Sequence, residues 1–177
     1  MMTSKIILLM LPNVKEKILG IDPGFGRVGY GIIEQKSNNE WVAVDFGCIV
    51  TSPKTSFVER LLEVRNELQK IIIEHRPTRV AVEELFFFKN VKTAIEVGQA
   101  RGVILLTAVE SGLPIDEFTP LQVKQAMTGY GRAEKKQMQK IVAAILGLKK
   151  PIKSDDAADA LAVALTAGQS LWHSKLK

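Results

Sequence analysis

The sequence predicts an α/β domain built on a mixed five-stranded sheet with helices on both faces. Three β-rich runs come first, and the apolar runs after them alternate between strand and helix spacing. Consecutive strands joined by short turns pair antiparallel, whereas strands separated by a helix pair in parallel. With 177 residues, 46% of them hydrophobic, the chain can bury one core without disulfides.

The expected strands are short apolar runs that stop at turns or polar residues. The first stops at Asp22, just before Pro23-Gly24, and the fourth stops at Glu83. A polar stretch at 35–40 predicts the hairpin between the second and third strands. In order, we expect strands at Ile18–Asp22, Arg27–Glu34, Trp41–Thr51, Arg79–Glu83 and Ile115–Thr119.

The expected helices are bounded by ordinary start and stop signals. Arg76-Pro77 ends the first, because the residue before proline avoids helical angles, and Ser111-Gly112 ends the second. Thr119-Pro120 begins the third, which stops at 129–132. The first two helices are Ser56–His75 and Asn90–Glu110. The fourth is Ala133–Leu146, and the fifth, after a basic linker, is Ser154–Gly168. The last is apolar on nearly every face and is therefore expected to be buried.

The remaining segments and the composition set the domain organisation. We expect residues 1–17 to form an N-terminal extension, either an added strand or a poorly ordered arm, followed by one domain at 18–170 and a tail at 171–177. No run reaches the roughly 20 apolar residues of a membrane-spanning helix. The single cysteine, Cys48, suits a reducing compartment, so we expect a cytoplasmic protein with no membrane contact. The net charge of +5 modestly favours nucleic acid as a partner.

Four acidic residues at the ends of elements are candidates for one site. Asp22 and Glu83 end strands, and functional side chains collect at the carboxyl ends of strands. Asp156 and Asp159 are three residues apart on one helix face. A turn, surface charge or the helix dipole could explain the first three singly. Asp159 is harder to explain in this way, because its helical neighbours are apolar and a buried carboxylate needs a partner or a metal.

Crowded carboxylates indicate metal chemistry. Oxygen-only ligands suit Mg²⁺, with Mn²⁺ as a substitute, and two such ions can activate water and stabilise the leaving oxygen of a phosphodiester. Only His75 and His173 are available, and they form no Ser–His–Asp or Cys–His constellation. The segment Gly20–Gly26 could instead form a phosphate-binding turn, as in sugar kinases and related ATPases. That alternative requires a second phosphate loop, which the sequence lacks.

Six stretches of the chain, in this order, resemble the RuvC crossover junction endodeoxyribonucleases, a family of bacterial Holliday-junction resolvases. The resemblance extends from Ile18 to about Gly168. The stretches are Ile18–Gly31, Val82–Phe87, Gly98–Gly102, Gln122–Gln125, Ala133–Lys135 and Asp156–Ala162. The resemblance implies an RNase H-like fold and a Mg²⁺-dependent endonuclease that acts in DNA recombination and repair.

The resemblance also assigns the metal-site acids. It selects Glu83 over Glu84 and Asp156 over Asp155, a choice that the residues alone leave open. Some relatives have histidine at the position of Asp156, so this position is expected to tolerate change better than the others. The implied catalytic and metal-binding residues are Asp22, Glu83, Asp156 and Asp159.

DNA-binding residues and partners follow from the same resemblance. The junction-probing aromatic falls on Phe86, and the basic residues near the scissile phosphate fall on Lys124 and Lys135. Core packing and a solvated helix face are the plain alternatives. The expected partners are four-way junction DNA, a second copy of the chain and a branch-migration motor complex. The long apolar helix Asn90–Glu110 is the candidate for the contact between the two copies. Another RNase H-like nuclease, or a junction-binding protein without nuclease activity, are the alternative functions.

Overall fold

The computed structural model describes residues 15–37, 40–85 and 91–175, and it confirms the predicted mixed sheet. The strands follow the order β3-β2-β1-β4-β5 across the sheet. β1, β2 and β3 pair antiparallel, while β1, β4 and β5 pair in parallel. The strands are β1 (Lys17–Asp22), β2 (Arg27–Ser37), β3 (Glu40–Val50), β4 (Arg79–Glu83) and β5 (Ile115–Phe118).

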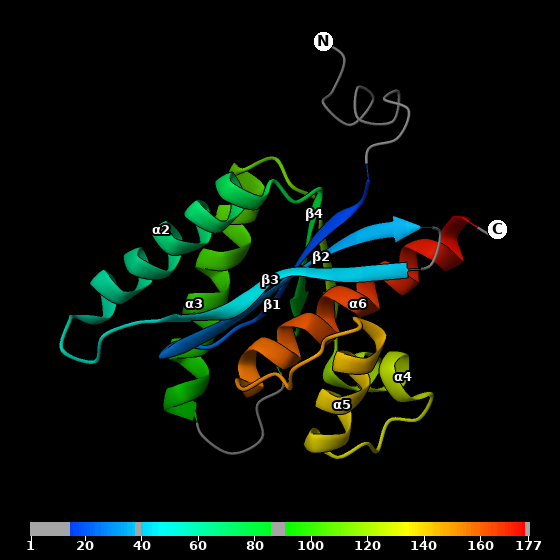
Figure 1. Ribbon diagram of the computed structural model, residues 1–177. Helices are drawn as coiled ribbons and strands as arrows, with labels where there is room; N and C mark the ends of the chain where they lie inside the picture. Colours follow the sequence, from blue (N-terminus) through cyan, green and yellow to red (C-terminus); the bar gives the residue numbers. More distant parts are fainter. Residues whose placement is uncertain (1–14, 38–39, 86–90, 176–177) are drawn as a thin grey trace, which may run out of the picture.

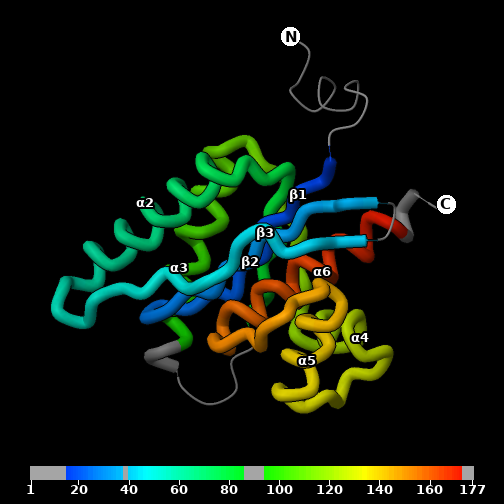
Figure 2. The backbone as a smooth tube through the Cα atoms, in the orientation of Figure 1, coloured from blue at the N-terminus to red at the C-terminus, as the bar shows by residue number. Residues whose placement is uncertain are grey.

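Helices cover both faces of the sheet, as predicted (Figure 1). α2 and α3 lie on one face, and α6 lies on the other with α4 and α5 packed outside it (Figures 1 and 2). None of the described helices has the length and apolar composition that crossing a membrane requires. The helices are α2 (Phe57–His75), α3 (Val91–Glu110), α4 (Pro120–Thr128), α5 (Lys135–Ile145) and α6 (Asp155–Lys175).

Capping residues set the starts of two helices where the sequence predicts them. Ser56 caps α2, accepting a hydrogen bond from the backbone of Glu59, whose side chain accepts one from Ser56 in return. Thr119 and Gln122 form the same arrangement at the start of α4. Because Thr119 directly follows β5, this cap ties α4 to the same edge of the sheet as the end of β4.

The predicted end of the last helix is wrong. α6 does not stop at Gly168 but continues to Lys175, so the helix includes residues 171–175. Gly168 lies against the indole ring of Trp41, where an added Cβ would stand 2.7 Å from a ring carbon. The glycine therefore makes room for Trp41 within the helix, at a cost of about 1 kcal/mol in helix propensity.

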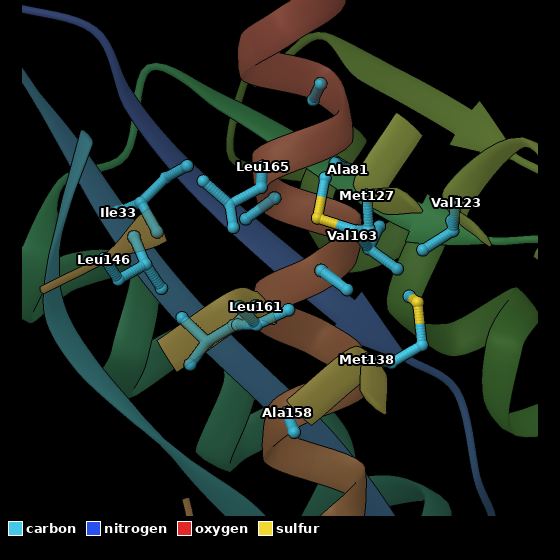
Figure 3. Packing of buried hydrophobic residues seen from close by; sticks show 14 of the residues in the cluster. Ile33, Ala81, Val123, Met127, Met138, Leu146, Ala158, Leu161, Val163 and Leu165 are labelled. Carbon is cyan, nitrogen blue, oxygen red and sulfur yellow. The ribbon is translucent and has the colours of Figure 1, made fainter. Parts of the chain in front are cut away.

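Two apolar clusters flank the sheet because side chains alternate along each strand. In β1, Ile18 faces the cluster around α6, while Leu19 and Ile21 face the cluster beneath α2 and α3. Figure 3 shows the first cluster, with Leu161 and Leu165 of α6 among side chains from the sheet, α4 and α5. α6 is therefore the central buried helix that the sequence predicts.

Glycine lets α6 lie directly on the sheet. A Cβ atom at Gly20 of β1 would stand 2.1 Å from the carbonyl oxygen of Ala160, closer than any real contact allows. At Gly31 of β2 an added Cβ would stand 2.7 Å from the side chain of Leu161. The helix that carries Asp156 and Asp159 is thus held close to the strand that ends in Asp22.

Candidate metal centre

Asp22 and Glu83 end neighbouring parallel strands at the same edge of the sheet. Ile21 of β1 pairs with Val82 of β4, and the two acids follow at the next position of each strand. Both side chains are partly buried. The structure therefore brings together the two acids that the sequence places at strand ends.

The two carboxyl groups sit in an environment that disfavours their charge. The pKa of Asp22 is raised to about 8, first by burial and then by the negative charges of Glu83, Asp159 and Asp156, which Lys135 only partly offsets. Burial, together with the charge of Asp159, raises the pKa of Glu83 to about 7. A shift of this size marks a site whose negative charge is not neutralised by the nearby cations.

α6 contributes the other two acids from its first turns. Asp156 and Asp159 are about one-third exposed. Burial raises the pKa of Asp159, although a hydrogen bond from Lys135 and its positive charge oppose the shift. The N-terminus of α6 is held by Ser154, whose Oγ accepts from the backbone of Ala157 at 3.4 Å. Asp22 is acted on electrostatically by the other three predicted acids, and Asp159 also acts on Glu83.

Both predicted lysines lie close enough to act on these acids. The Nζ of Lys135 is 3.1 Å from Asp159 Oδ2 and 3.5 Å from Asp155 Oδ2. Burial lowers the pKa of Lys135, but its contacts with Asp159 and Asp155 outweigh this and raise the pKa overall, so the lysine is charged. The charge of Lys124 lowers the pKa of Glu83. Phe86 lies outside the described residues.

The donor chemistry fits a divalent cation. Four carboxylates supply only hard oxygen ligands, and their mutual repulsion would be relieved by Mg²⁺ or Mn²⁺. As they stand, however, no three His, Cys, Asp or Glu side chains among the described residues are arranged to hold one ion. Asp156 instead contacts Arg27, and Asp159 contacts Lys135. Both carboxylates are therefore held by cationic side chains of the protein itself.

Three residues near Asp156 were missed by the sequence reasoning. Arg27 donates from Nε to Asp156 Oδ2 at 2.8 Å, and Cys48 Sγ lies 3.8 Å from the same oxygen. Ser154 Oγ lies 2.9 Å from Cys48 Sγ. Arg27 falls within a stretch of family resemblance, but its spacing from the acids gives no sign of the contact, which arises only when α6 packs on the sheet.

Known proteins similar to the chain cover nearly all of this fold. A family model described as crossover junction endodeoxyribonuclease RuvC matches residues 18–167. The RuvC of Caldicellulosiruptor saccharolyticus is 55% identical over 149 residues, which are 84% of this chain and 90% of that protein. The RuvC of Desulfitobacterium hafniense is 54% identical over 154 residues, 87% of this chain and 93% of that protein.

Solved structures agree with these sequence similarities. T. thermophilus RuvC in complex with Holliday junction substrate is 35% identical, with a TM-score of 0.85 over 90% of this chain and 96% of that one. The yeast mitochondrial Holliday junction resolvase Ydc2, at 15% identity and a TM-score of 0.67 over 96% of this chain and 84% of that one, shares the fold. The predicted RNase H-like fold is confirmed, and the chain belongs to the RuvC family of crossover junction endodeoxyribonucleases.

Proposed function

We propose that this protein is a structure-specific DNA endonuclease that resolves Holliday junctions by metal-dependent hydrolysis of phosphodiester bonds. The observation that carries the proposal is the cluster of four acids at the ends of β1 and β4 and the start of α6, flanked by lysines, in a chain of the RuvC family. A relative solved with Holliday junction substrate supports the choice of DNA.

The proposed metal ligands are Asp22, Glu83, Asp156 and Asp159, and the proposed ion is Mg²⁺, with Mn²⁺ as a substitute. The family is one of metal-dependent nucleases. A bound cation supplies Lewis-acid stabilisation of the charge that develops on the phosphodiester. Asp22 and Glu83 must be ionised to bind it, so their raised pKa values couple cation binding to proton release.

Lys124 and Lys135 are the proposed contacts to the phosphate groups beside the scissile bond. Lys124 interacts electrostatically with Glu83, and Lys135 forms an ion pair with Asp159, which supports a position for both lysines at the edge of the metal centre. The Nζ of Lys135 lies 3.1 Å from Asp159, so a phosphate bound beside this acid would lie near a positive charge. Phe86, three residues after Glu83, is proposed to stack on an unpaired base at the crossover, worth ~1–3 kcal/mol.

A homodimer would give one junction two centres, one for each strand to be cut, related by C₂ symmetry. The two copies are proposed to meet along α3, because one face of this helix is apolar and exposed. Ile95, Leu106 and Val109 are 58–62% exposed and lie on one helix face together with Gly102, beside which a Cβ would meet nothing within 4 Å. We define these four residues as the α3 stripe.

The family resemblance adds a branch-migration motor complex as a partner, acting with the protein in the cytoplasm.

Cleavage of a synthetic four-way junction tests the proposal against its alternatives. The matched linear duplex and an RNA–DNA hybrid of the same sequence are incubated in parallel, with Mg²⁺ or with EDTA, using the parent and Asp22→Asn. We expect paired symmetric nicks on the junction alone, lost in EDTA and in the variant. Faster cleavage of the hybrid would indicate another RNase H-like nuclease, and binding without cleavage in Mg²⁺ or Mn²⁺ would indicate a junction-binding protein.

A further inference from the structure

Arg27 connects the sheet to the start of α6 through a side chain that no step of the proposed function uses. It is the first residue of β2, and its Nε donates to Asp156 Oδ2 at 2.8 Å. Its terminal nitrogen also lies 3.6 Å from Cys48 Sγ. A guanidinium group presents several donors in a fixed fork, so one side chain can reach both partners at once.

Cys48 and Ser154 complete a network around the same carboxylate. Cys48 Sγ lies 3.8 Å from Asp156 Oδ2 and 2.9 Å from Ser154 Oγ. The carbonyl oxygen of Ser154 accepts a hydrogen bond from the backbone of Ala158, inside α6. The network therefore fixes both the carboxylate of Asp156 and the turn of helix that carries it.

The neighbouring acid, Asp155, is held by different residues on another side of the helix. Successive residues of an α-helix point about 100° apart, so Asp155 and Asp156 face different surroundings. Gln139 of α5 donates to Asp155 Oδ1 at 2.5 Å, and Lys135 lies 3.5 Å from Asp155 Oδ2. Two identical side chains in one helical turn are thus distinguished by their partners, Arg27 for one and α5 for the other.

We propose that Arg27 is a positioning residue that selects Asp156, and not Asp155, as the carboxylate that joins Asp22 and Glu83 in the metal centre. The inference rests on the proposed function to the extent that these acids bind a cation. Without Arg27, Asp156 loses the only donor nitrogen that contacts it among the described residues, and its carboxylate is left with the weaker contact to Cys48 Sγ at 3.8 Å. Asp155 would keep its own contact with Lys135 at 3.5 Å.

Calorimetry measures Mn²⁺ binding to the full-length protein without DNA. The inference is tested by whether Arg27→Ala weakens or strengthens this binding. If Arg27 only competed with the metal for Asp156, Arg27→Ala would strengthen Mn²⁺ binding, because a positive charge is removed. If Arg27 positions the carboxylate, the same variant should weaken Mn²⁺ binding by about ten-fold, as loss of an outer-sphere partner does elsewhere. Arg27→Lys, which keeps the charge and one donor, should recover most of the affinity.

Arg65→Ala is the matched control. Arg65 is also a partly exposed arginine, paired with Glu110 at 3.5 Å between α2 and α3. The Arg65→Ala variant should have the Mn²⁺ affinity of the parent and the same melting temperature, measured at the same pH. Unchanged or tighter Mn²⁺ binding in Arg27→Ala would overturn the inference. A melting temperature that falls equally in Arg27→Ala and Arg27→Lys, with equal losses of affinity, would overturn it too, because it would indicate a structural role.

A second set of variants tests whether Arg27 selects Asp156 over Asp155. In the parent, Asp156→Asn should weaken Mn²⁺ binding and Asp155→Asn should change it little, whereas in the Arg27→Ala background the two effects should become similar. An unaltered difference between them would contradict selection by Arg27. Asp22→Asn separates this failure from failure of the proposed function, because Mn²⁺ binding that is unaffected by Asp22→Asn would show that the metal is bound elsewhere.

Discussion

Gly29 of β2 lies directly beneath the backbone of Asp156, so that a Cβ atom on Gly29 would stand 2.1 Å from the Asp156 carbonyl oxygen. Gly29 also pairs with Asp22 across β1 and β2. One glycine therefore touches both halves of the acid cluster, the strand that ends in Asp22 and the helix that begins with Asp156. The spacing between the two acids depends on the absence of a side chain between them.

Gly29→Ala should damage the centre more than the fold. The methyl group meets backbone, which cannot turn aside, so the start of α6 must shift. We expect a loss of about 1–3 kcal/mol in the free energy of unfolding and a larger proportional loss of junction cleavage. Urea unfolding and cleavage rates measure the two effects. Gly98→Ala on α3 is the control, because its Cβ would meet nothing within 4 Å and should stabilise the helix by about 0.5–1 kcal/mol.

The stability of the metal-free protein should fall as the pH rises. Asp22 and Glu83 have folded-state pKa values of about 8 and 7, above their ordinary values of 3.8 and 4.5. The folded protein therefore holds these protons more tightly than the unfolded chain, and this contribution to stability is lost between about pH 4 and pH 8. In EDTA, the melting temperature should be several degrees lower at pH 8.5 than at pH 5.5. An equal or higher value at pH 8.5 would contradict the assigned environment.

Asp22→Asn should remove most of that pH dependence and should stabilise the metal-free protein at pH 8.5, because a neutral amide has no charge to desolvate. Mg²⁺ should raise the melting temperature of the parent more at pH 8.5 than at pH 5.5, and should raise that of the variant little at either pH. Thermal unfolding with and without Mg²⁺ gives all four comparisons. A variant less stable than the parent at pH 8.5 in EDTA would show that Asp22 stabilises the fold.

Glu83 and Glu84 offer a matched pair of adjacent acids. Glu83→Gln should lower junction cleavage by about a hundred-fold or more, since it changes a proposed metal ligand. Glu84→Gln should stay within a few-fold of the parent. The rates are compared under single-turnover conditions with junction binding measured beside them. Similar losses in both variants would mean that the position of the ligand in this strand is misassigned.

Phe86→Ala should slow cleavage more than it weakens binding, because a ring that stacks on an unpaired base acts once the junction is bound. Binding is measured by titration of a labelled junction, and cleavage by single-turnover rates. If the melting temperature falls, and the loss of cleavage is no larger than the loss of folded protein, Phe86 belongs to the core.

The α3 stripe should hold the dimer together. Leu106→Glu places a charge in the middle of the stripe and should shift the protein to monomers in sedimentation experiments, with loss of paired nicks. Ile73→Glu on α2, at a residue that is 65% exposed and outside the stripe, should leave the association state unchanged. A Leu106→Glu protein that sediments as the parent does would exclude this contact.

The sequence was sufficient for the order of the elements and for the meeting of the strand-end acids, because both follow from local patterns. Hydrophobic spacing separates strands from helices, and parallel strands bring their carboxyl ends to one edge. The predicted end of α6 at Gly168 is wrong, because a glycine that ends a helix and a glycine that makes room for a neighbouring ring look the same in sequence. Arg27 and Cys48 were missed because their partner, Asp156, lies more than 100 positions away along the chain.

Among the described helices, α6 is the most buried, and it also carries two acids of the proposed metal centre. Substitutions in its buried part are therefore expected to affect both the fold and the site. Apart from Asp159, every residue from Ala157 to Ala167 is buried, so a larger side chain at those positions must displace the helix against β1 and β2. Such a displacement would move Asp156 and Asp159 relative to Asp22. Substitutions deep in the core should therefore be detected first as changes in metal affinity, before the protein loses its fold, while neutral variation accumulates on the outer face of α2.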